Sequence, residues 1–589
     1  MTDITERFVD SADGTRIAVF EQGNPDGPTV VLVHGWPDSH VLWDGVAPLL
    51  AERFRVIRYD NRGVGNSAVP KHHSSYTMAR FADDFAAVTA AVSPAAPVHV
   101  LAHDWGSVGV WEYLARPGAA DVVGSFTSVS GPSSDHINRF VMDGLKQPYR
   151  PRRFVRGLGQ LARLSYMGAF STPVLAPAAI RIAFARGAMR RRLLKDGIAR
   201  EAIHHSQAFV DDAVNSMKVY RANFFPGLRH ARTDHHVDVP VQLIVNTRDP
   251  YVRPYAYADI PNRVPRLWRR DLVAGHWAPM SHPGQLARAV AEFADHLAGA
   301  PATRELARAE VGVERAPFGD QLVSVTGAGS GIGRATALAF AAMGAEIVVS
   351  DIDERSAAAT VAEITAGGGI AHAYRLDVAD GEAVQRFAEQ VCAAHGVPDI
   401  VVNNAGVGHA GFFLDTPVAE FDRVLDINFR GVVNGCRSFG KHLAERGTGG
   451  HIVNVASMAS YVPVNVMNAY CTSKAAVYMF SDCLRAELDS AGIGVTTICP
   501  GVIGTDIINT TRFSLPPGRT YEDEDIRKRV RRGFTVRRVG PDKVARAIVD
   551  AVRKNKPVRP VNAEAYLGYG VAHALPQVMR STARGGNIM

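Results

Sequence analysis

The sequence predicts two α/β domains in one chain, each built on a mainly parallel sheet. Apolar strand-like runs alternate with helical patterns twice, first in residues 1–300 and again in residues 321–589. Such alternation is typical of parallel sheets covered by helices. A chain of 589 residues also exceeds the roughly 250 to 300 residues at which a single hydrophobic core stops growing. Residues 301–320 are rich in Ala, Pro and charge and lack a strand pattern, so we expect a linker there.

The composition is that of a globular enzyme and excludes a disordered or fibrous chain. Apolar residues make up 47% and charged residues 21% of the chain. The first residues lack the apolar core of a signal peptide, and no apolar run reaches the roughly 18 residues of a membrane span. All 5 cysteines lie in the second half without a CxxC pair, so we expect reduced thiols and a cytoplasmic protein. The HisHis pairs have no partners at zinc-site spacing, and we expect no metal site.

Basic residues gather toward the C-terminus of a chain whose net charge is only +7. Residues 525–560 are rich in Arg and Lys, but no nucleic-acid-binding motif accompanies them, so we expect no nucleic-acid partner. A solvated helical face is one interpretation of this run, and attraction to an anionic membrane or an acidic ligand is the other. Because residues 563–589 are apolar and then basic, we expect peripheral contact with the inner face of a membrane through this tail and the basic run that precedes it.

Asp104 stands where an apolar strand is expected to turn sharply into a helix, in the stretch PVHVLAHDWGSVG. A small-x-nucleophile-x-Gly turn after a strand exposes its central side chain at the edge of a sheet. A carboxylate there suits substitution at an sp³ carbon, because the ester that it forms can be hydrolysed at its own carbonyl. The alternative for Asp104 alone is a helix N-cap, a position that Asp often occupies.

Four motifs occur in the order VHGWP, AHDWG, LIVNTRDP and GHW. With them, residues 1–300 resemble the epoxide hydrolase branch of the α/β-hydrolase fold, apart from Ala102, where many relatives have Gly. The strand pattern stops between about 131 and 236, where the sequence becomes helical and rich in Arg, so we expect a helical cap inserted there.

This resemblance implies the catalytic roles of the first domain. Asp104 is expected to be the nucleophile, Asp249 the supporting acid and His276 the base. The backbone N–H groups of Trp36 and Trp105 are expected to form the oxyanion hole, with a cis peptide bond after Trp36 as in the family. The expected reaction is the opening of an epoxide to a vicinal diol through an aspartyl ester.

Two cap tyrosines distinguish epoxides from haloalkanes as substrates. YMGAFSTP and VYRANFF place Tyr166 and Tyr220 where the family carries its ring-opening acids. The alternative is a haloalkane dehalogenase-type hydrolase, which usually has Asn where this chain has Trp36, although Trp105 suits either class. Each tyrosine taken singly is also explained as an ordinary packing residue.

VSVTGAGSGIGRATA predicts a dinucleotide site in the second domain. It places Gly327, Gly331 and Gly333 between a strand and a helix, where small residues let the backbone approach a pyrophosphate at the helix N-terminus. Asp351, which ends the next strand, is expected to accept hydrogen bonds from the adenosine ribose and to repel a 2′-phosphate. NAD is therefore expected over NADP, although Arg334 and Arg355 lie near in the sequence.

Residues 321–560 resemble the short-chain dehydrogenases through NNAG, DINFRG, VNVAS, AYCTSK and CPGVIGTDI. The resemblance implies Tyr470 as the acid/base, Lys474 as a charge that stabilises its phenolate, Ser457 as a substrate contact and Asn428 as part of a water relay. Further cofactor contacts are expected at Ser330, Ile332, Asp377, Val378, Asn404 and Thr505, besides Tyr470 and Lys474.

The whole arrangement resembles the fused epoxide hydrolase/short-chain dehydrogenase proteins of mycolate-producing actinobacteria. That resemblance implies a long-chain lipid epoxide, an alcohol or ketone substrate for the second domain, and a homo-oligomer. A different class of function stays open, in which the second domain is a non-catalytic NAD-sensing or dimerisation module. Replacing Tyr470 by Phe distinguishes the two, because only a catalytic domain loses oxidoreduction while it keeps NAD binding.

Overall fold

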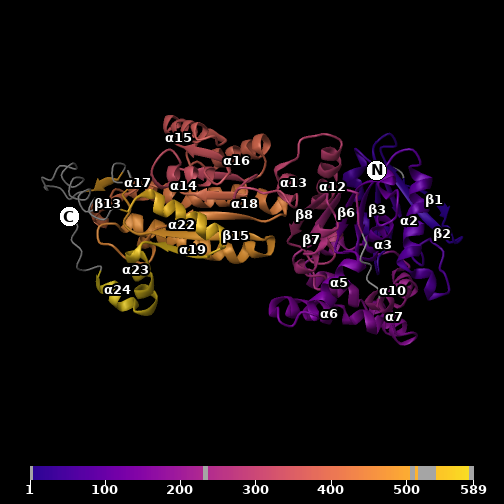
Figure 1. The fold of residues 1–589 in the computed structure, drawn as a ribbon. Coiled ribbons are helices and arrows are strands. Elements are labelled where there is room, and N and C mark those ends of the chain that lie inside the picture. Colours follow the sequence, from indigo (N-terminus) through magenta and orange to yellow (C-terminus); the bar gives the residue numbers. More distant parts are fainter. Residues whose placement is uncertain (1–3, 230–235, 505–510, 515–538, 583–589) are drawn as a thin grey trace. The chain divides into compact units, whose positions relative to one another are not determined.

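The computed structural model describes residues 4–229, 236–504, 511–514 and 539–582 and divides into two compact units (Figure 1). The units are Met1–Val313 and Glu314–Met589, so the boundary falls inside the predicted linker. The linker is shorter than expected, however. Helix α13 (Arg304–Ala309) buries Leu306 and Ala309 in a cluster of the first unit, and the N–H of Val311 donates to the carbonyl of Leu267 at 2.8 Å.

The first unit contains an eight-stranded sheet in the order β1-β2-β4-β3-β5-β6-β7-β8. The strands β1 and β2 run antiparallel to their neighbours and the others are parallel. In chain order they are β1 (Thr5–Asp10), β2 (Arg16–Gly23), β3 (Thr29–Val33), β4 (Arg55–Tyr59), β5 (Val98–His103), β6 (Val123–Val129), β7 (Val241–Asn246) and β8 (Leu267–Leu272). Strands β3 and β7 are buried throughout, as expected for central parallel strands.

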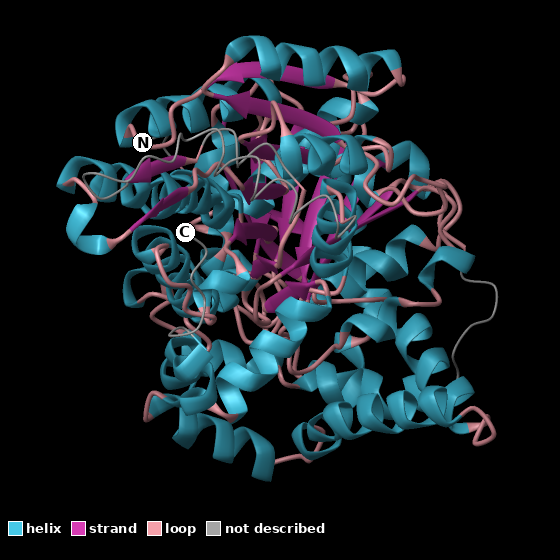
Figure 2. Cartoon of the chain, turned by 90° about the vertical axis from the view of Figure 1, so that its left-hand side faces the viewer, coloured by secondary structure: helices cyan, strands magenta, loops and turns pink. Residues whose placement is uncertain are grey.

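Helices pack on both faces of this sheet and form one apolar cluster with each face. They are α1 (Ala47–Ala51), α2 (Met78–Val92), α3 (Asp104–Leu114), α4 (Ala119–Val122), α11 (Ala278–Ser281) and α12 (Pro283–Leu297). Figure 2 shows the helices of the chain in cyan around the strands in magenta. The expected cap is present between β6 and β7. It consists of α5 (Ser134–Leu145), α6 (Pro151–Phe170), α7 (Leu175–Ala185), α8 (Ala188–Lys195), α9 (Phe209–Ser216) and α10 (Lys218–Arg229).

The second unit contains a seven-stranded parallel sheet in the order β11-β10-β9-β12-β14-β15-β17. The strands are β9 (Leu322–Thr326), β10 (Glu346–Asp351), β11 (Ala371–Arg375), β12 (Ile400–Asn403), β14 (Gly450–Val455), β15 (Ile493–Pro500) and β17 (Val558–Val561). A two-stranded sheet joins β13 (His409–Gly411) to β16 (Arg512–Ser514). All 5 cysteines are free.

Helices also cover both faces of the second sheet. One face carries α14 (Gly331–Ala341), α15 (Glu354–Ala366) and α22 (Pro541–Arg553), and the other carries α16 (Gly381–His395), α18 (Gly431–Arg446) and α19 (Asn468–Leu488). The other α-helices among the described residues of this unit are α17 (Val418–Leu425), α23 (Ala563–Ala574) and α24 (Pro576–Thr582). The two predicted α/β folds are thus confirmed, and the order of the second sheet reverses between β9 and β12, where doubly wound folds bind ligands.

The basic C-terminal run lies only partly within the described residues, which exclude 515–538 and 583–589. Its described part, α22, buries its apolar face in the domain core and so fits the interpretation of a helix with one solvated face. Among the described residues, no single helix has the length and hydropathy of a membrane span; α6 and α7 reach them only together, with a bend of 99° between them.

Candidate active sites

Asp104 lies at the turn from β5 to α3 with the left-handed φ of 48°. Such a conformation persists in a non-glycine residue only where the surroundings hold it. The neighbouring backbone is very close: a Cβ on Gly106 would lie 2.1 Å from the carbonyl oxygen of His34, and one on Gly35 would lie 2.6 Å from Cβ of Asp104. The N-cap interpretation is wrong, because His103 is the N-cap of α3 and Asp104 is its first residue.

Backbone N–H groups hold the Asp104 carboxylate. The N–H of Trp36 donates to Oδ2 at 3.0 Å, and the N–H of Trp105 also bonds the carboxylate. The peptide bond after Trp36 is cis, as predicted. Burial raises the pKa of Asp104, while His276 and the two N–H groups oppose that shift. The groups predicted as an oxyanion hole therefore meet at the predicted nucleophile.

Asp249 follows β7 and His276 follows β8, and the two are hydrogen bonded. Nδ1 of His276 lies 2.9 Å from Oδ2 of Asp249, and its Nε2 lies 3.8 Å from Oδ1 of Asp104. Burial disfavours the Asp249 carboxylate, but His276 and the N–H groups of Tyr251 and Val252 outweigh burial and lower the pKa of Asp249. An ionised Asp249 only accepts hydrogen bonds, so Nδ1 carries the proton and Nε2 keeps its lone pair.

The ionisation of His276 is set by the same neighbours. Burial disfavours its imidazolium, but the carboxylates of Asp249 and Asp104 outweigh burial and raise the pKa of His276 above the ordinary value of 6.5. The arrangement can therefore deprotonate a water molecule near neutral pH and stabilise the imidazolium that results.

The cap contributes two tyrosines to the same site, Tyr166 on α6 and Tyr220 on α10. Tyr166 lines one cavity with Asp104 and His276. Its ring centroid lies 5.9 Å from that of Tyr220, and the two hydroxyls are hydrogen bonded, while Tyr220 also bonds the side chain of Trp105. Burial holds the pKa of both phenols well above 10, so both stay protonated, which is the state that a proton donor needs.

The cavity is otherwise walled mainly by apolar side chains. They come largely from α5, α6 and neighbouring loops: Val108, Ile137, Val141, Leu161, Leu164, Met167, Phe224 and Val252. Walls of this kind suit the apolar part of a substrate.

Two groups of this site were not predicted. Asp38 is buried, accepts a hydrogen bond from the indole of Trp277 at 3.1 Å, and has a pKa raised to about 7, because of its burial and the nearby Asp104 carboxylate. Tyr251 lines the cavity, and its ring lies edge-on to His276 at 4.9 Å. The signal that could have identified them in the sequence is their position next to a motif: Asp38 directly follows HGWP, and Tyr251 directly follows NTRDP.

In the second unit, the glycine-rich turn joins β9 to α14. Gly327 and Gly331 have φ values of 62° and 53°, and a Cβ on Gly333 would lie 2.1 Å from the carbonyl oxygen of Gly327. Side chains at these glycine positions would fill the space in front of the N-terminus of α14. Ser330 is the N-cap of this helix, and Ile332 is half-buried. The turn has the form that a pyrophosphate needs.

Asp351 faces this turn, as predicted for a ribose contact. Its Oδ2 accepts from the N–H of Gly329 at 2.9 Å. Arg334 forms an ion pair with Glu363. Asn404 anchors the turn from β12, since its amide donates to the carbonyls of Thr326 and Gly327 at 3.0 and 3.2 Å.

Two of the other expected cofactor contacts can be located. Asp377 and Val378 follow β11, and the carbonyl of Val378 accepts from Asn434 at 3.0 Å. Thr505 lies outside the described residues.

The predicted catalytic residues of the second unit cluster around α19. The hydroxyl of Ser457 bonds that of Tyr470. The ammonium of Lys474 donates to the carbonyl of Val455 at 2.9 Å and lies 5.9 Å from the Tyr470 ring centroid. Asn428 is buried, and its amide donates to the carbonyl of Val407 at 3.0 Å and to Ser473 at 3.1 Å.

One expected effect within this cluster is not seen. Burial raises the pKa of Tyr470, opposed only in part by the Ser457 hydroxyl, and burial lowers the pKa of Lys474 to about 8. Lys474 thus does not offset the burial of the phenol in this state, and its ammonium donates to the backbone carbonyl of Val455.

The comparisons with known proteins agree with both folds. A family model described as alpha/beta hydrolase fold matches residues 28–283, and one described as short chain dehydrogenase matches residues 321–514. Fold and sites together define an enzyme in which an α/β hydrolase is fused to a short-chain dehydrogenase. The chain belongs to the family of the fused proteins named "Probable oxidoreductase EphD", since those of Mycobacterium bovis and Mycobacterium tuberculosis are 63% identical to it over 99% of both chains.

Other relatives match the second unit alone. The D-threitol dehydrogenase of Mycolicibacterium smegmatis is 40% identical over 31% of this chain and 70% of its own. A solved short-chain dehydrogenase/reductase from Burkholderia phymatum, in complex with NAD, is 28% identical over 44% of this chain and 95% of its own, with a TM-score of 0.41. The predicted fused family is thus confirmed, and the second unit takes a nicotinamide cofactor.

Proposed function

We propose that the first unit hydrolyses epoxides to vicinal diols through an ester on Asp104. The observation that carries this proposal is that one carboxylate, two backbone N–H donors and a His–Asp pair meet at a cavity that the protonated phenol of Tyr166 lines, with the protonated phenol of Tyr220 directly behind it. The phenols favour an epoxide over a haloalkane, since an epoxide oxygen must gain a proton as it leaves carbon, whereas a halide leaves as an anion and needs only N–H donors.

Ring opening needs one nucleophile and one acid. An oxygen of the Asp104 carboxylate attacks an epoxide carbon, and the bond from that carbon to the ring oxygen breaks. The ring oxygen takes the bonding pair and a proton from Tyr166, which is hydrogen bonded to Tyr220. The product of this step is a hydroxyalkyl ester of Asp104.

Hydrolysis of the ester regenerates the enzyme. Nε2 of His276 takes a proton from water, whose oxygen adds to the ester carbonyl carbon, and the N–H groups of Trp36 and Trp105 stabilise the developing oxyanion. Collapse expels the diol alkoxide, which takes the proton from His276, while the proton of the new carboxyl returns to the phenolate. One carboxylate oxygen of Asp104 then derives from water.

We propose NAD-dependent alcohol or ketone oxidoreduction for the second unit. A bound nicotinamide would accept or supply the hydride. Tyr470 moves the proton of the substrate hydroxyl, Ser457 orients that oxygen through its bond to the same phenol, and Lys474 supplies the nearby positive charge. Asp351 supports NAD over NADP, because its carboxylate faces the glycine-rich turn, and Arg334 is already paired with Glu363.

The proposed substrate of the first unit is a long-chain lipid epoxide, supported by the apolar cavity wall. The diol that forms carries hydroxyls that the second unit could oxidise. The haloalkane alternative, with the second unit as a sensing or dimerisation module, predicts halide release without diol and no redox chemistry.

Product analysis tests these proposals. Purified protein is incubated with an epoxidised fatty acid or a terminal haloalkane, each with and without NAD. We expect diol from the epoxide, none with the Asp104→Ala variant, and no halide. In ¹⁸O-water under single turnover, mass spectrometry of the peptide that contains Asp104 should show one incorporated ¹⁸O. Halide release without diol would favour the alternative, and NADH that appears only after diol forms would link the two units.

A further inference from the structure

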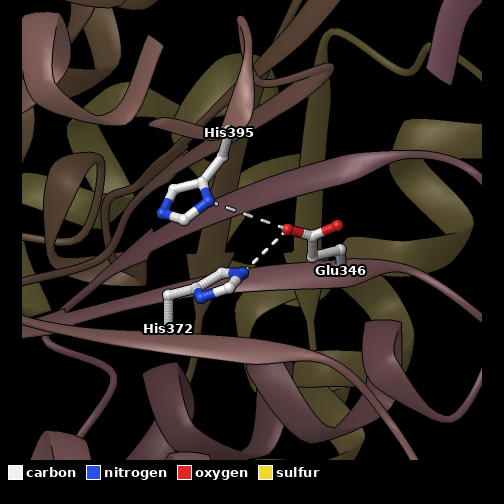
Figure 3. A group of neighbouring side chains, drawn as sticks. All are labelled: Glu346, His372 and His395. Carbon is white, nitrogen blue, oxygen red and sulfur yellow. Dashed lines mark hydrogen bonds and ion pairs between the residues drawn. The ribbon is translucent and has the colours of Figure 1, made fainter. Parts of the chain in front are cut away.

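We propose that Glu346, His372 and His395 form a binding site for a divalent transition metal such as Zn²⁺ in the second unit (Figure 3). Glu346 begins β10, His372 lies on the adjacent strand β11, and His395 ends α16. Figure 3 shows both imidazoles directed toward the Glu346 carboxylate. Two imidazoles and a carboxylate are a ligand set that suits Zn²⁺ and its neighbours in the first transition row.

The distances suit a single ion. Oε1 of Glu346 lies 2.8 Å from Nε2 of His372 and 4.0 Å from Nδ1 of His395, and one ligand atom from each residue lies within 4.8 Å of the others. Ligand atoms about 2.1 Å from a tetrahedral ion are about 3.4 Å apart. The observed separations lie on both sides of that value, so the three side chains would rotate slightly to place one ligand atom each on the ion.

A fourth side chain fixes the orientation of His395. The hydroxyl of Tyr374 lies 2.7 Å from Nε2 of His395. If Nε2–H donates to Tyr374, the lone pair of His395 is on Nδ1, the nitrogen that faces Glu346. A partner on the non-ligating nitrogen is typical of histidines that bind metals. The two imidazoles stack with centroids 3.9 Å apart, an arrangement that favours neutral rings over two like charges.

The site can exchange ions with solvent but lies away from the cofactor. The side chains of His372, Glu346 and His395 are 32%, 16% and 15% exposed. Glu346 is at the start of β10 and Asp351 at its end, about 17 Å apart at 3.3 Å per residue. A metal here would therefore clamp the edge strand β11 and the end of α16 to β10, and its effect would be on stability and not on hydride transfer.

Metal binding by chelator-treated, full-length protein tests the site. Equilibrium dialysis against Zn²⁺ followed by elemental analysis should find one tightly bound ion, and Zn²⁺ should raise the unfolding temperature. His372→Ala, His395→Ala and the nearly isosteric Glu346→Gln should each weaken binding at least about tenfold, as loss of a ligand does. The matched control is His72→Ala/His73→Ala, a neighbouring histidine pair in the first unit of which His72 is exposed and His73 half-buried, and it should bind as the unaltered chain does.

These binding measurements can also reject the proposed metal site. Absence of a bound ion in the unaltered chain, or equal binding by Glu346→Gln, would reject it. If the histidine variants fail to fold, Glu346→Gln still tests the site, with Co²⁺ as the probe in place of Zn²⁺. A tetrahedral Co²⁺ site has intense visible absorption bands, and this variant should lose them.

A second inference rests on different residues: the structure assigns the outer face of α6 and α7 to contact with an anionic lipid bilayer. Residues 144–195 contain 12 Lys and Arg and no Asp or Glu. The same stretch exposes large apolar side chains: Val155 65%, Leu158 49%, Val174 78%, Leu175 75% and Ile182 55%. Three of these arginines, Arg153, Arg181 and Arg192, pair with aspartates that lie outside the stretch. The stretch as a whole remains basic and apolar, which is typical of interfacial helices.

The position of this face explains how contact with a bilayer would serve the enzyme, and this explanation rests on the proposed lipid substrate. The opposite face of α6 lines the cavity with Leu161, Leu164 and Tyr166. A lipid leaving the bilayer would thus meet the helix whose inner side walls the active site. This surface is distinct from the C-terminal segment expected from the sequence.

Vesicle co-sedimentation tests the surface, with phosphatidylglycerol/phosphatidylcholine vesicles against pure phosphatidylcholine. We expect binding to the anionic vesicles only, and at least about tenfold weaker binding by Leu175→Asp/Ile182→Asp, since both apolar area and charge balance change. Leu567→Asp, on the exposed side of α23, is the control and should bind normally. Turnover of a short, water-soluble epoxide should be unchanged in all variants, which separates this proposal from the hydrolase proposal.

Two results would overturn the assignment. Loss of vesicle binding on removal of residues 583–589, with normal binding by Leu175→Asp/Ile182→Asp, would move the contact to the C-terminus. A dimer in light scattering that this double variant dissociates, without any vesicle binding, would show that the face meets a second copy of the chain.

Discussion

The backbone N–H of Trp36 lies 3.0 Å from Oδ2 of Asp104, across 68 positions of the chain. This contact holds the carboxylate, and in the proposed ester intermediate the same N–H would face the ester carbonyl oxygen. The donor is therefore in place before negative charge develops on that oxygen, which is the property that makes preorganised donors effective. Ester formation and ester hydrolysis can thus be separated by changing one group at a time.

His276→Gln should separate them. The variant keeps the nucleophile and the phenols but lacks the base, so we expect ester formation to continue while turnover falls by about 10³-fold, within the range for loss of a general base. Intact-mass spectrometry should show the enzyme plus one substrate. His573→Gln, at an exposed histidine of α23, is the control and should turn over normally. Failure of the adduct to accumulate would show that His276 acts before the ester forms.

The pH dependence of hydrolysis should follow His276. Its pKa lies above 6.5, and only the neutral imidazole is a base, so turnover is full at alkaline pH and is lost as pH falls through that raised pKa. Asp38 contributes to the raised pKa, and its own pKa is about 7. We therefore expect Asp38→Asn to move the acidic limb of kcat to lower pH, whereas the exposed Asp238→Asn should leave it in place. A limb unmoved by Asp38→Asn would contradict the coupling.

The phenols should matter only while the ring opens. Tyr166→Phe is expected to slow ester formation from an epoxide by about 10²-fold, the lower range for a general acid, and Tyr220→Phe to slow it less, since Tyr220 acts through Tyr166. Rapid-quench measurement of the ester in the His276→Gln background gives this rate directly. Tyr255→Phe, at a half-buried tyrosine outside the cavity lining, serves as the control. Equal loss in all three variants would mean that the phenols serve packing alone.

The sequence located this site because each of its motifs is local. Asp104 and Trp36 lie within contiguous stretches whose order along the chain is itself informative, and parallel strands then bring their ends together. Asp38 and Tyr251 were missed, because only the fold shows that they face His276. The cluster of Glu346, His372 and His395 has no sequence signature, since its members come from two strands and a helix and meet only through the β10 and β11 register.

The linker shows a second limit of sequence reasoning. Six residues of α13 offer too short an apolar pattern to distinguish a packed helix from a polar connection. Only the three-dimensional structure shows that Leu306 is buried against Trp268 and Phe293, and hence that this segment is a packed helix. Likewise, the pKa of Tyr470 depends on how deeply the phenol is buried, which the spacing of Tyr470 and Lys474 does not encode.

Asp351 should determine which nicotinamide cofactor the second unit prefers. Its carboxylate, 2.9 Å from the Gly329 N–H, would repel a 2′-phosphate and accept from ribose hydroxyls. We expect Asp351→Ser to weaken NAD binding by about tenfold, which is one lost charged hydrogen bond, and to strengthen NADP binding. Fluorescence titration of each reduced cofactor measures both effects without any substrate. Asp353→Ser, two residues later at the N-cap of α15, is the matched control and should change neither affinity. Unchanged cofactor preference in Asp351→Ser would place the adenosine ribose elsewhere on the turn.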